Sequence, residues 1–257
     1  MTLQRKTVLI TGAGGGLGLQ MASTYLQRGA SIVLCDVDES RLAAVRQKYA
    51  LSHPDKVLAL WADVTDESSV QRLVTSAVEK FGRLDVVVNN AAVMDKFEPG
   101  AVCTRATWDA VLAVNLTGPF LVTKHAVLQM ERQERPGGLI INIGSNASFK
   151  GLSGGVAYVA SKHGLVGVTK NTASYYGRKG IYAVALLLGY MAGTNIYDAF
   201  ADCPHQEGLD KMYQTQPAYV DVPTDHVARY AAFLSEDDVA KSANGSCIVI
   251  NGNWPEA

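Results

Sequence analysis

The sequence has 257 residues, of which 48% are hydrophobic and 18% are charged, and its formal net charge is −1. This length and composition are typical of one globular α/β domain, so we expect a single domain over residues 1–257. The charge balance offers no basic surplus for nucleic acid or an anionic membrane surface, and we expect neither as a partner.

The four cysteines lie far apart, at positions 35, 103, 203 and 247, with no C-x-x-C pair. This spacing predicts neither disulfides nor a metal site and fits a reducing compartment. The first apolar run, residues 8–10, is too short for a signal-peptide core, and the longest, residues 181–188, is far shorter than a membrane span. We therefore expect a cytoplasmic protein without a metal.

A buried strand is predicted at residues 7–10, followed by a glycine-rich turn and an amphipathic helix at residues 17–28. Missing Cβ atoms let the backbone approach a pyrophosphate, and the helix N-terminus offers N–H groups and a positive dipole end. The spacing is G-x-x-x-G-x-G, without the G-K-S/T of a P-loop. A tight turn without a ligand is the alternative. The candidate cofactor contacts are Gly12, Gly15, Gly16, Leu17 and Gly18.

A second strand, residues 31–35, ends at Asp36. An acidic side chain here can accept hydrogen bonds from the adenosine ribose hydroxyls and would repel a 2′-phosphate. No Arg or Lys stands in the glycine turn or directly after Asp36. The pattern favours NAD over NADP, and the alternative is a helix N-cap, a role that Asp38 could fill equally well.

Strands then alternate with helices. Strands are predicted at residues 56–61 and 84–88, with a helix at 66–81 between them. The second strand is nearly all apolar, as expected inside a parallel sheet. It ends in small residues that would let a cofactor cross the sheet edge, although an ordinary turn is the alternative. The residues after these strands that become cofactor candidates are Asp63, Val64, Asn90 and Ala91.

A helical stretch at residues 106–131 places Asn115 among apolar residues, and Gly118-Pro119 would loosen it there. On its own, a buried asparagine usually satisfies a backbone group. The next strand, residues 139–143, leads to Ser145, at the carboxyl edge where open parallel sheets bind ligands.

Tyr158 and Lys162 follow on a helix that reaches residue 177. At positions i and i+4 they share one face. An ammonium beside a phenol favours the phenolate, so the pair predicts a pKa for Tyr158 below its usual value of about 10. Such a tyrosine could exchange protons near neutral pH. A half-buried tyrosine beside a solvated lysine is the alternative, because this spacing is common in helices.

The rest of the chain completes the alternation, with strands at 181–188 and 247–250 and a helix at 224–234. No linker or repeat interrupts it. We therefore predict an α/β fold: a single Rossmann-like, doubly wound parallel sheet of about seven strands flanked by helices.

In order and position, these signals resemble the short-chain dehydrogenase/reductase family, in its compact single-domain form. The resemblance covers nearly the whole chain, and Ser145 precedes Tyr158 by thirteen residues, the spacing usual in that family. The motifs that carry it are Thr11-Gly12-x-x-x-Gly16-x-Gly18, Asp36, Asp63-Val64, Asn89-Asn90-Ala91, Asn115, Ser145 and Tyr158-x-x-x-Lys162.

The resemblance implies a catalytic set of Asn115, Ser145, Tyr158 and Lys162. Tyr158 would exchange a proton with the substrate oxygen, to which Ser145 would also hydrogen-bond. Lys162 would lower the Tyr158 pKa and hold the nicotinamide ribose, and Asn115 would keep a water that links Lys162 to solvent. Asp63 and Val64 would flank the adenine of NAD, the implied cofactor. Tyr158 and Lys162 thus also count as cofactor contacts.

Some positions depart from the family pattern on the nicotinamide and substrate sides. Leu188-Gly189 replaces a Pro-Gly pair, and Thr194 lies one residue later than the threonine that contacts the carboxamide. We keep Gly189 and Thr194 as cofactor candidates. The other departures are Ala92, Val184 and Asn251-Gly252-Asn253.

By analogy, residues 190–217 form a substrate lid. Aromatic and methionine side chains with no arginine predict an apolar or aromatic, uncharged alcohol or ketone. We expect NAD-dependent hydride transfer with a secondary alcohol or ketone; the alternatives are a non-redox cyclase or isomerase and a regulatory NAD-binding protein. The resemblance also implies a homodimer or homotetramer. Candidates for the substrate wall are Tyr190, Met191, Tyr197, Phe200, Met212, Tyr213, Met94, Phe149 and Val156, whereas His163 is expected to point elsewhere.

Overall fold

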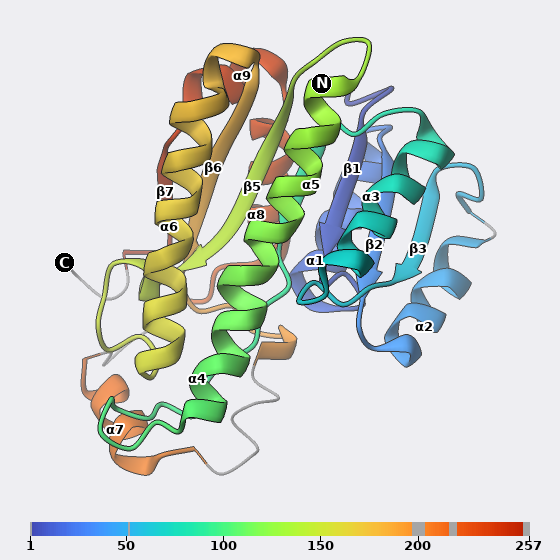
Figure 1. Cartoon of the computed structure of the whole chain (residues 1–257). Helices are drawn as coiled ribbons and strands as arrows, with labels where there is room; N and C mark the ends of the chain where they lie inside the picture. The colour runs from blue at the N-terminus through green and yellow to red at the C-terminus, as the bar shows by residue number, and fades with distance from the viewer. Residues whose placement is uncertain (1, 51, 197–203, 216–219, 254–257) are drawn as a thin grey trace.

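The computed structural model describes residues 2–50, 52–196, 204–215 and 220–253. Within them, seven parallel strands form one sheet in the order β3-β2-β1-β4-β5-β6-β7 (Figure 1). This confirms the predicted fold class. The strands are β1 (Thr7–Thr11), β2 (Ser31–Asp36), β3 (Val57–Trp61), β4 (Val86–Asn89), β5 (Gly138–Ser145), β6 (Ile181–Leu188) and β7 (Cys247–Ile250).

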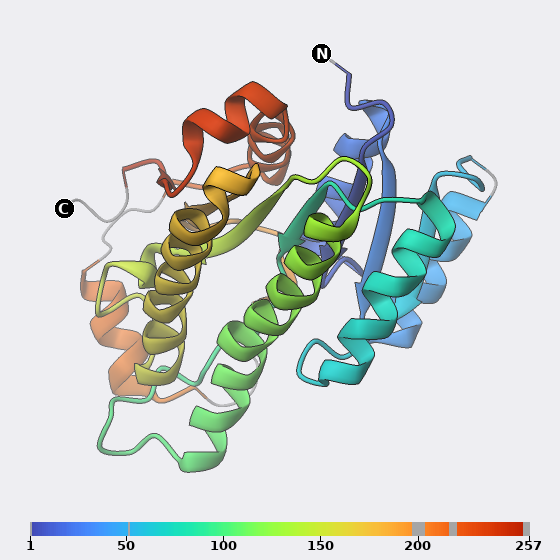
Figure 2. The same ribbon diagram turned by 45° about the horizontal axis from the view of Figure 1, so that its top comes forward.

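Helices cover both faces of the sheet (Figures 1 and 2). One face packs against α3, α5 and α6, and the other against α1, α2, α8 and α9. The helices are α1 (Gly16–Gln27), α2 (Glu39–Ala50), α3 (Glu67–Phe81), α4 (Arg105–Leu112), α5 (Gly118–Arg132), α6 (Val156–Tyr176), α7 (Gln206–Gln214), α8 (Thr224–Leu234) and α9 (Asp237–Ala243).

The strands are apolar along their length because both of their faces are buried. Val8 and Ile10 of β1 belong to the core on the α1 side, whereas Leu9 between them belongs to the core on the α3 side. Alternate side chains of a strand point to opposite faces, so a strand between two helical layers needs apolar residues at every position.

The predicted helix at 106–131 is interrupted. A π turn at Ala113–Thr117 separates α4 from α5, and Gly118-Pro119 begins α5. Proline lacks the N–H that would continue the helical ladder, which accounts for the break. The stretch 105–132 is apolar and long enough to cross a membrane by length and composition alone, but half of its most apolar window is buried within the fold.

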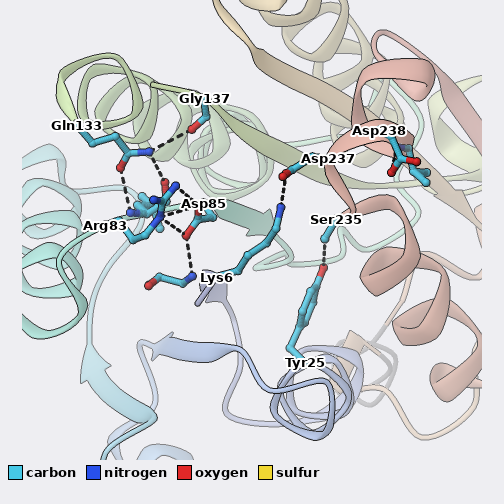
Figure 3. Close-up of polar contacts among 12 residues, drawn as sticks. Lys6, Tyr25, Arg83, Asp85, Gln133, Gly137, Ser235, Asp237 and Asp238 are labelled. Carbon is cyan, nitrogen blue, oxygen red and sulfur yellow. Dashed lines mark hydrogen bonds and ion pairs between the residues drawn. The ribbon is translucent and has the colours of Figure 1, made fainter. Parts of the chain in front are cut away.

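The amino-terminal ends of the strands are held by polar contacts (Figure 3). The buried Asp85 accepts a hydrogen bond from the Thr7 N–H at 2.9 Å and one from Arg83 Nε at 2.8 Å. The Tyr25 and Ser235 hydroxyls join α1 to the end of α8 at 2.8 Å. These contacts lie at the amino-terminal ends of the strands, away from the carboxyl ends where ligands bind in open parallel sheets.

Candidate active site

The carboxyl ends of strands β1 to β6 surround a cavity of about 550 Å³. β1 and β4 are neighbours there although they are not consecutive, which makes this the switch point at which open parallel sheets bind ligands. The predicted site residues that line the cavity are Gly12, Gly15, Gly16, Leu17, Asp36, Asp63, Val64, Asn90, Ala91, Ser145, Tyr158, Lys162, Gly189 and Thr194. The two other candidates, Gly18 and Asn115, do not line the cavity but contact residues that do: Gly18 packs against Gly12, and Asn115 hydrogen-bonds the Val93 backbone.

The glycine turn is built for close approach of the backbone. Gly12 has φ +61°, and a Cβ there would lie 2.7 Å from Ala91 Cα. A Cβ at Gly18 would lie 2.6 Å from the Gly12 carbonyl oxygen. Helix α1 begins at Gly16, so its first N–H groups and its positive dipole end lie at this turn. These features fit the pyrophosphate of a dinucleotide.

Asp36 ends β2 on the cavity wall. Its carboxylate accepts the Gly14 N–H at 2.8 Å and the Asp38 N–H at 3.0 Å. A carboxylate has about four acceptor positions, so capacity remains for ribose hydroxyls. Asp38 hydrogen-bonds the N–H groups of Ser40 and Arg41 and so fills the helix-capping role suggested as the alternative for Asp36.

Arg41, in the first turn of α2, also lines this end of the cavity. Its Nε lies 3.3 Å from an Asp38 carboxylate oxygen. When the Asn195 amide is oriented with its oxygen toward Arg41, that oxygen lies 2.9 Å from Nη1. The sequence interpretation missed Arg41 because it considered only the glycine turn and the residues directly after Asp36. A predicted helix at residues 39–50 would have placed it at the sheet edge.

Asn90 lines the cavity but its side chain serves the glycine turn. Its Nδ2 donates to the carbonyl oxygens of Thr11 at 2.9 Å and Gly12 at 3.0 Å. The preceding Asn89 is buried within the sheet and donates to the Asn142 side chain at 2.8 Å. Both asparagines therefore join neighbouring strands at their ends, a role that the alternative of an ordinary turn does not include.

Ser145 and Tyr158 meet at the end of β5. Ser145 caps a short 3₁₀ turn, Asn146–Ser148, by accepting the Ala147 N–H at 3.2 Å. Ser145 and Tyr158 line the same cavity, and the Ser145 side chain lies close enough to the 5%-exposed Tyr158 side chain to act on its pKa. The two hydroxyls are thus close enough to contact one substrate oxygen.

For the Tyr158 pKa, the structure corrects the expectation. Burial raises the pKa of Tyr158 to about 12, and the charge of Asp95 adds to the increase, whereas the nearby Ser145 side chain opposes it. Lys162 Nζ lies 5.5 Å from the centre of the Tyr158 ring and donates to the Ile143 carbonyl at 2.9 Å. Burial lowers the pKa of Lys162 to about 8. Desolvation therefore outweighs the attraction on which the prediction relied.

Asn115 lies in the π turn and is 1% exposed. Its Oδ1 accepts the Val93 N–H at 2.8 Å, and its Nδ2 donates to the Val93 carbonyl at 2.8 Å and to Ser161 Oγ at 3.2 Å. The side chain therefore joins the cavity-lining Val93 to the helix that carries Tyr158 and Lys162. This accords with the expectation that a buried helical asparagine satisfies backbone groups.

The lid contributes apolar side chains to the same cavity. Met94 lines it as predicted, but Phe149 is 42% exposed and Val156 lines a separate small hollow. His163 is exposed and its Nδ1 faces the Val159 carbonyl, away from the site as expected. Tyr197 and Phe200 lie outside the described residues. The lid residues that line the cavity are Tyr190, Met191, Thr194, Asn195, Ile196, Met212 and Tyr213.

The altered segment after β7 is tied directly to the active site. Asn251 Nδ2 donates to Asn146 Oδ1 at 2.8 Å in a buried contact, and Asn146 directly follows Ser145. A Cβ at Gly189 would lie 2.7 Å from Asn251 Cα, so these segments pack closely. Across the part of the chain that the structure describes, no group of three or more His, Cys, Asp or Glu side chains is arranged to hold a metal ion.

A family model described as short chain dehydrogenase matches residues 6–202. The short chain dehydrogenase/reductase dpchG of Colletotrichum higginsianum is 42% identical over 258 residues, covering 98% of this chain and 94% of the relative. The crystal structure of levodione reductase is similar with a TM-score of 0.85 and 33% identity over 97% of each chain. That of 3-ketoacyl-(acyl-carrier-protein) reductase from Brucella melitensis, complexed with NADH, has a TM-score of 0.85 and 27% identity over 98% of each.

The comparisons and the geometry agree. The family match spans the glycine turn, Ser145, Tyr158 and Lys162, all of which line one cavity. The chain belongs to the short-chain dehydrogenase family of oxidoreductases, which bind a nicotinamide cofactor.

Proposed function

We propose that the protein transfers a hydride between NAD and a secondary alcohol or ketone. The observation that carries the proposal is that Ser145, Tyr158 and Lys162 line the same cavity as the glycine turn and Asp36. One end of this cavity offers a proton donor and acceptor, and the other offers groups suited to adenosine and pyrophosphate. The non-redox cyclase or isomerase alternative gains no support from the three relatives reported above, which are named dehydrogenase or reductase.

In this proposal Tyr158 and Ser145 both act on the oxygen atom of the substrate. During oxidation, the Tyr158 phenolate takes the proton of the substrate hydroxyl, while the Ser145 hydroxyl hydrogen-bonds the same oxygen. During reduction, the Tyr158 phenol returns that proton to the oxygen. The buried Lys162 ammonium, next to the Tyr158 ring, stabilises the phenolate when it forms. When bound, NAD would supply the hydride acceptor at its nicotinamide ring.

The preference for NAD over NADP is part of the proposal and rests on Asp36. The Asp36 carboxylate would repel a 2′-phosphate, but Arg41 lies on the same stretch of wall and would attract one. Dissociation constants for both dinucleotides test this directly. We expect NAD to bind more tightly, Asp36→Asn to reduce the preference, and Arg41→Ala to weaken NADP binding more than NAD binding. Tighter binding of NADP by the unchanged protein would contradict the assignment.

An apolar or aromatic, uncharged substrate suits the lid side of the cavity. Among the described residues that line the cavity, positive charge comes from Arg41, at the adenosine end, and Lys162, which donates to Ile143. The described lid residues on the wall are apolar or neutral, so a substrate carboxylate would lack a partner there. The similarity to levodione reductase is in keeping with an uncharged ketone.

The test of function is absorbance at 340 nm with NAD and a panel of secondary alcohols, and with NADH and the matching ketones. We expect turnover, and we expect Tyr158→Phe to lower kcat by roughly 10²- to 10⁴-fold while NAD still binds. Tyr182→Phe, in β6 and outside the cavity, is the matched control and should keep full activity. If NAD binds but no alcohol or ketone turns over, the proposed reaction is wrong.

We also propose a homodimer or homotetramer. Large apolar side chains are exposed on α5, at Phe120 and Leu128, and on α6, at Tyr175. Exposed apolar side chains on neighbouring helices are typical of a surface that a second copy covers. Light scattering with size-exclusion chromatography measures the oligomeric state, and a monomer at micromolar concentration would contradict this proposal.

A further inference from the structure

The loop between β4 and α4 carries a buried carboxylate at the start of the catalytic helix. Asp95 is 2% exposed, and its carboxylate accepts three backbone N–H groups: Phe97 at 3.1 Å, Gly155 at 2.8 Å and Tyr158 at 2.8 Å. Gly155 is the N-cap residue of α6 and has no side chain for capping. Asp95 therefore satisfies the free N–H groups of that helix from a distant part of the sequence, and its negative charge complements the helix dipole.

The fit between this loop and α6 is tight. A Cβ at Gly155 would lie 2.6 Å from Asp95 Oδ2 and 2.6 Å from the Glu98 backbone nitrogen. The Val156 N–H donates to the Glu98 carbonyl at 2.9 Å. Residues 95–98, here called the bridge segment, thus hold the backbone N–H groups of the cap residue Gly155 and of two residues in the first turn of α6, Val156 and Tyr158.

The bridge segment also holds the lid helix. The His205 N–H donates to the Lys96 carbonyl at 2.8 Å, just before α7 begins. A Cβ at Gly208 would collide with the Phe97 carbonyl oxygen, so α7 lies directly on the segment. Figures 1 and 2 both show α7 beside the loop that precedes α4. Because Met212 and Tyr213 of α7 line the cavity, the position of this helix shapes the substrate wall.

The bridge segment is held in an unfavourable backbone conformation. Phe97 has φ +62° and is 3% exposed. A bulky residue in the left-handed region costs about 1–2 kcal/mol, and such conformations persist where the surroundings fix them. Here the surroundings are the catalytic helix on one side and the lid helix on the other.

We propose that Asp95 is a positioning residue for the reaction. Its carboxylate fixes the backbone of Tyr158, and the bridge segment holds the Tyr158 phenol at a fixed position relative to the substrate wall formed by α7. This inference rests on the proposed function for its kinetic consequences. Its structural core, the control of Tyr158 by Asp95, is measurable without turnover. Among the described residues, the charged and polar side chains that act on Tyr158 besides Asp95 are Ser145 and Lys162.

Asp95→Asn separates positioning from general stability. The Phe97 and Gly155 N–H groups both bond to Oδ1, which an asparagine oxygen can replace, whereas the Tyr158 N–H would then face an amide donor. We expect kcat to fall about 10- to 100-fold, with a much smaller change in the dissociation constant for NAD. The loss of a negative charge should also move the pH limb of kcat, and the titration of Tyr158 followed by ¹³C NMR, to lower pH.

Gly155→Ala is the second variant, because it forces the carboxylate away from the helix start while keeping its charge. We expect a similar loss of kcat. Gly151→Ala, in the same loop with open space around it, is the matched control and should behave as the unchanged protein. Gly208→Ala should displace α7 and raise the KM for substrate without moving the pH limb.

The outcomes separate the two proposals. If Asp95→Asn keeps kcat and the Tyr158 titration unchanged, or only lowers the melting temperature, Asp95 is a structural cap and the inference is wrong. If the unchanged protein has no turnover but the Tyr158 titration shifts in Asp95→Asn, the proposed function fails and the control of Tyr158 by Asp95 stands. If Asp95→Asn does not fold, equal kcat in Gly155→Ala and Gly151→Ala would overturn the inference.

Discussion

Replacing Asn115 by alanine tests whether this side chain acts by holding structure. The substitution removes three hydrogen bonds, two to the Val93 backbone and one to Ser161 Oγ. At about 1 kcal/mol for each bond, the free energy of unfolding should fall by ~3 kcal/mol. A fall of that size corresponds to a decrease in Tm of roughly 6–12 °C for a domain of this size.

The assay is urea unfolding together with thermal melting, at one protein concentration. Asn171→Ala, at an exposed position of α6, is the matched control and should change the free energy of unfolding by less than about 0.5 kcal/mol. Asn115→Asp should destabilise the protein as well, because it keeps the acceptor for the Val93 N–H but sets a carboxylate against the Val93 carbonyl. An Asn115→Ala protein that melts with the control would refute the structural role.

Three further predictions concern other parts of the fold. Gly12→Ala should lower the free energy of unfolding by about 1–3 kcal/mol and weaken NAD binding, because Gly12 has a positive φ and a Cβ there would clash with Ala91. Gly167→Ala is the control: its Cβ meets open space, so neither the free energy of unfolding nor NAD binding should decrease. Asp85→Ala should cost about 1–3 kcal/mol in urea unfolding by leaving the Thr7 N–H without its partner, yet keep kcat per folded molecule. Folding lowers the pKa of Lys162 from 10.5 to about 8, so between pH 8 and 10 the unfolded state binds more protons than the folded state. The free energy of unfolding should therefore increase by up to ~2 kcal/mol from pH 8 to pH 10. In Lys162→Met this increase should be absent.

Local patterns were enough to predict the elements that carry the site. The helix predicted at residues 66–81 matches α3, in which the N-cap Asp66 accepts the Ser68 N–H at 3.0 Å and Gly82 ends the helix in the left-handed conformation. The apolar runs of β6 and β7 also matched the structure. Because the carboxyl ends of parallel strands share one edge, the residues after those runs converge on one cavity.

Features that depend on distant partners could not be predicted. Asp95 lies about 60 residues from Gly155 and Tyr158, and nothing in its own neighbourhood indicates that its carboxylate is buried. The raised pKa of Tyr158 likewise follows from the surrounding protein, whereas its spacing from Lys162 predicted the opposite shift. Helices α2, α7 and α9 were missed because charged residues or irregular spacing obscure their periodicity.

The hydrogen bond between Asn251 and Asn146 links the edge of the sheet to the catalytic serine. β7 is the outermost strand on its side, and Asn251 directly follows it. Proteins open locally in cooperative units, and edge strands are exposed to such openings. Separation of β7 from β6 would release Asn146 and with it the turn that Ser145 caps. Hydrogen exchange at residues 146–149 should therefore rise and fall with exchange in β7. A second molecule that covered the exposed side of β7 would lower the exchange rate of both segments.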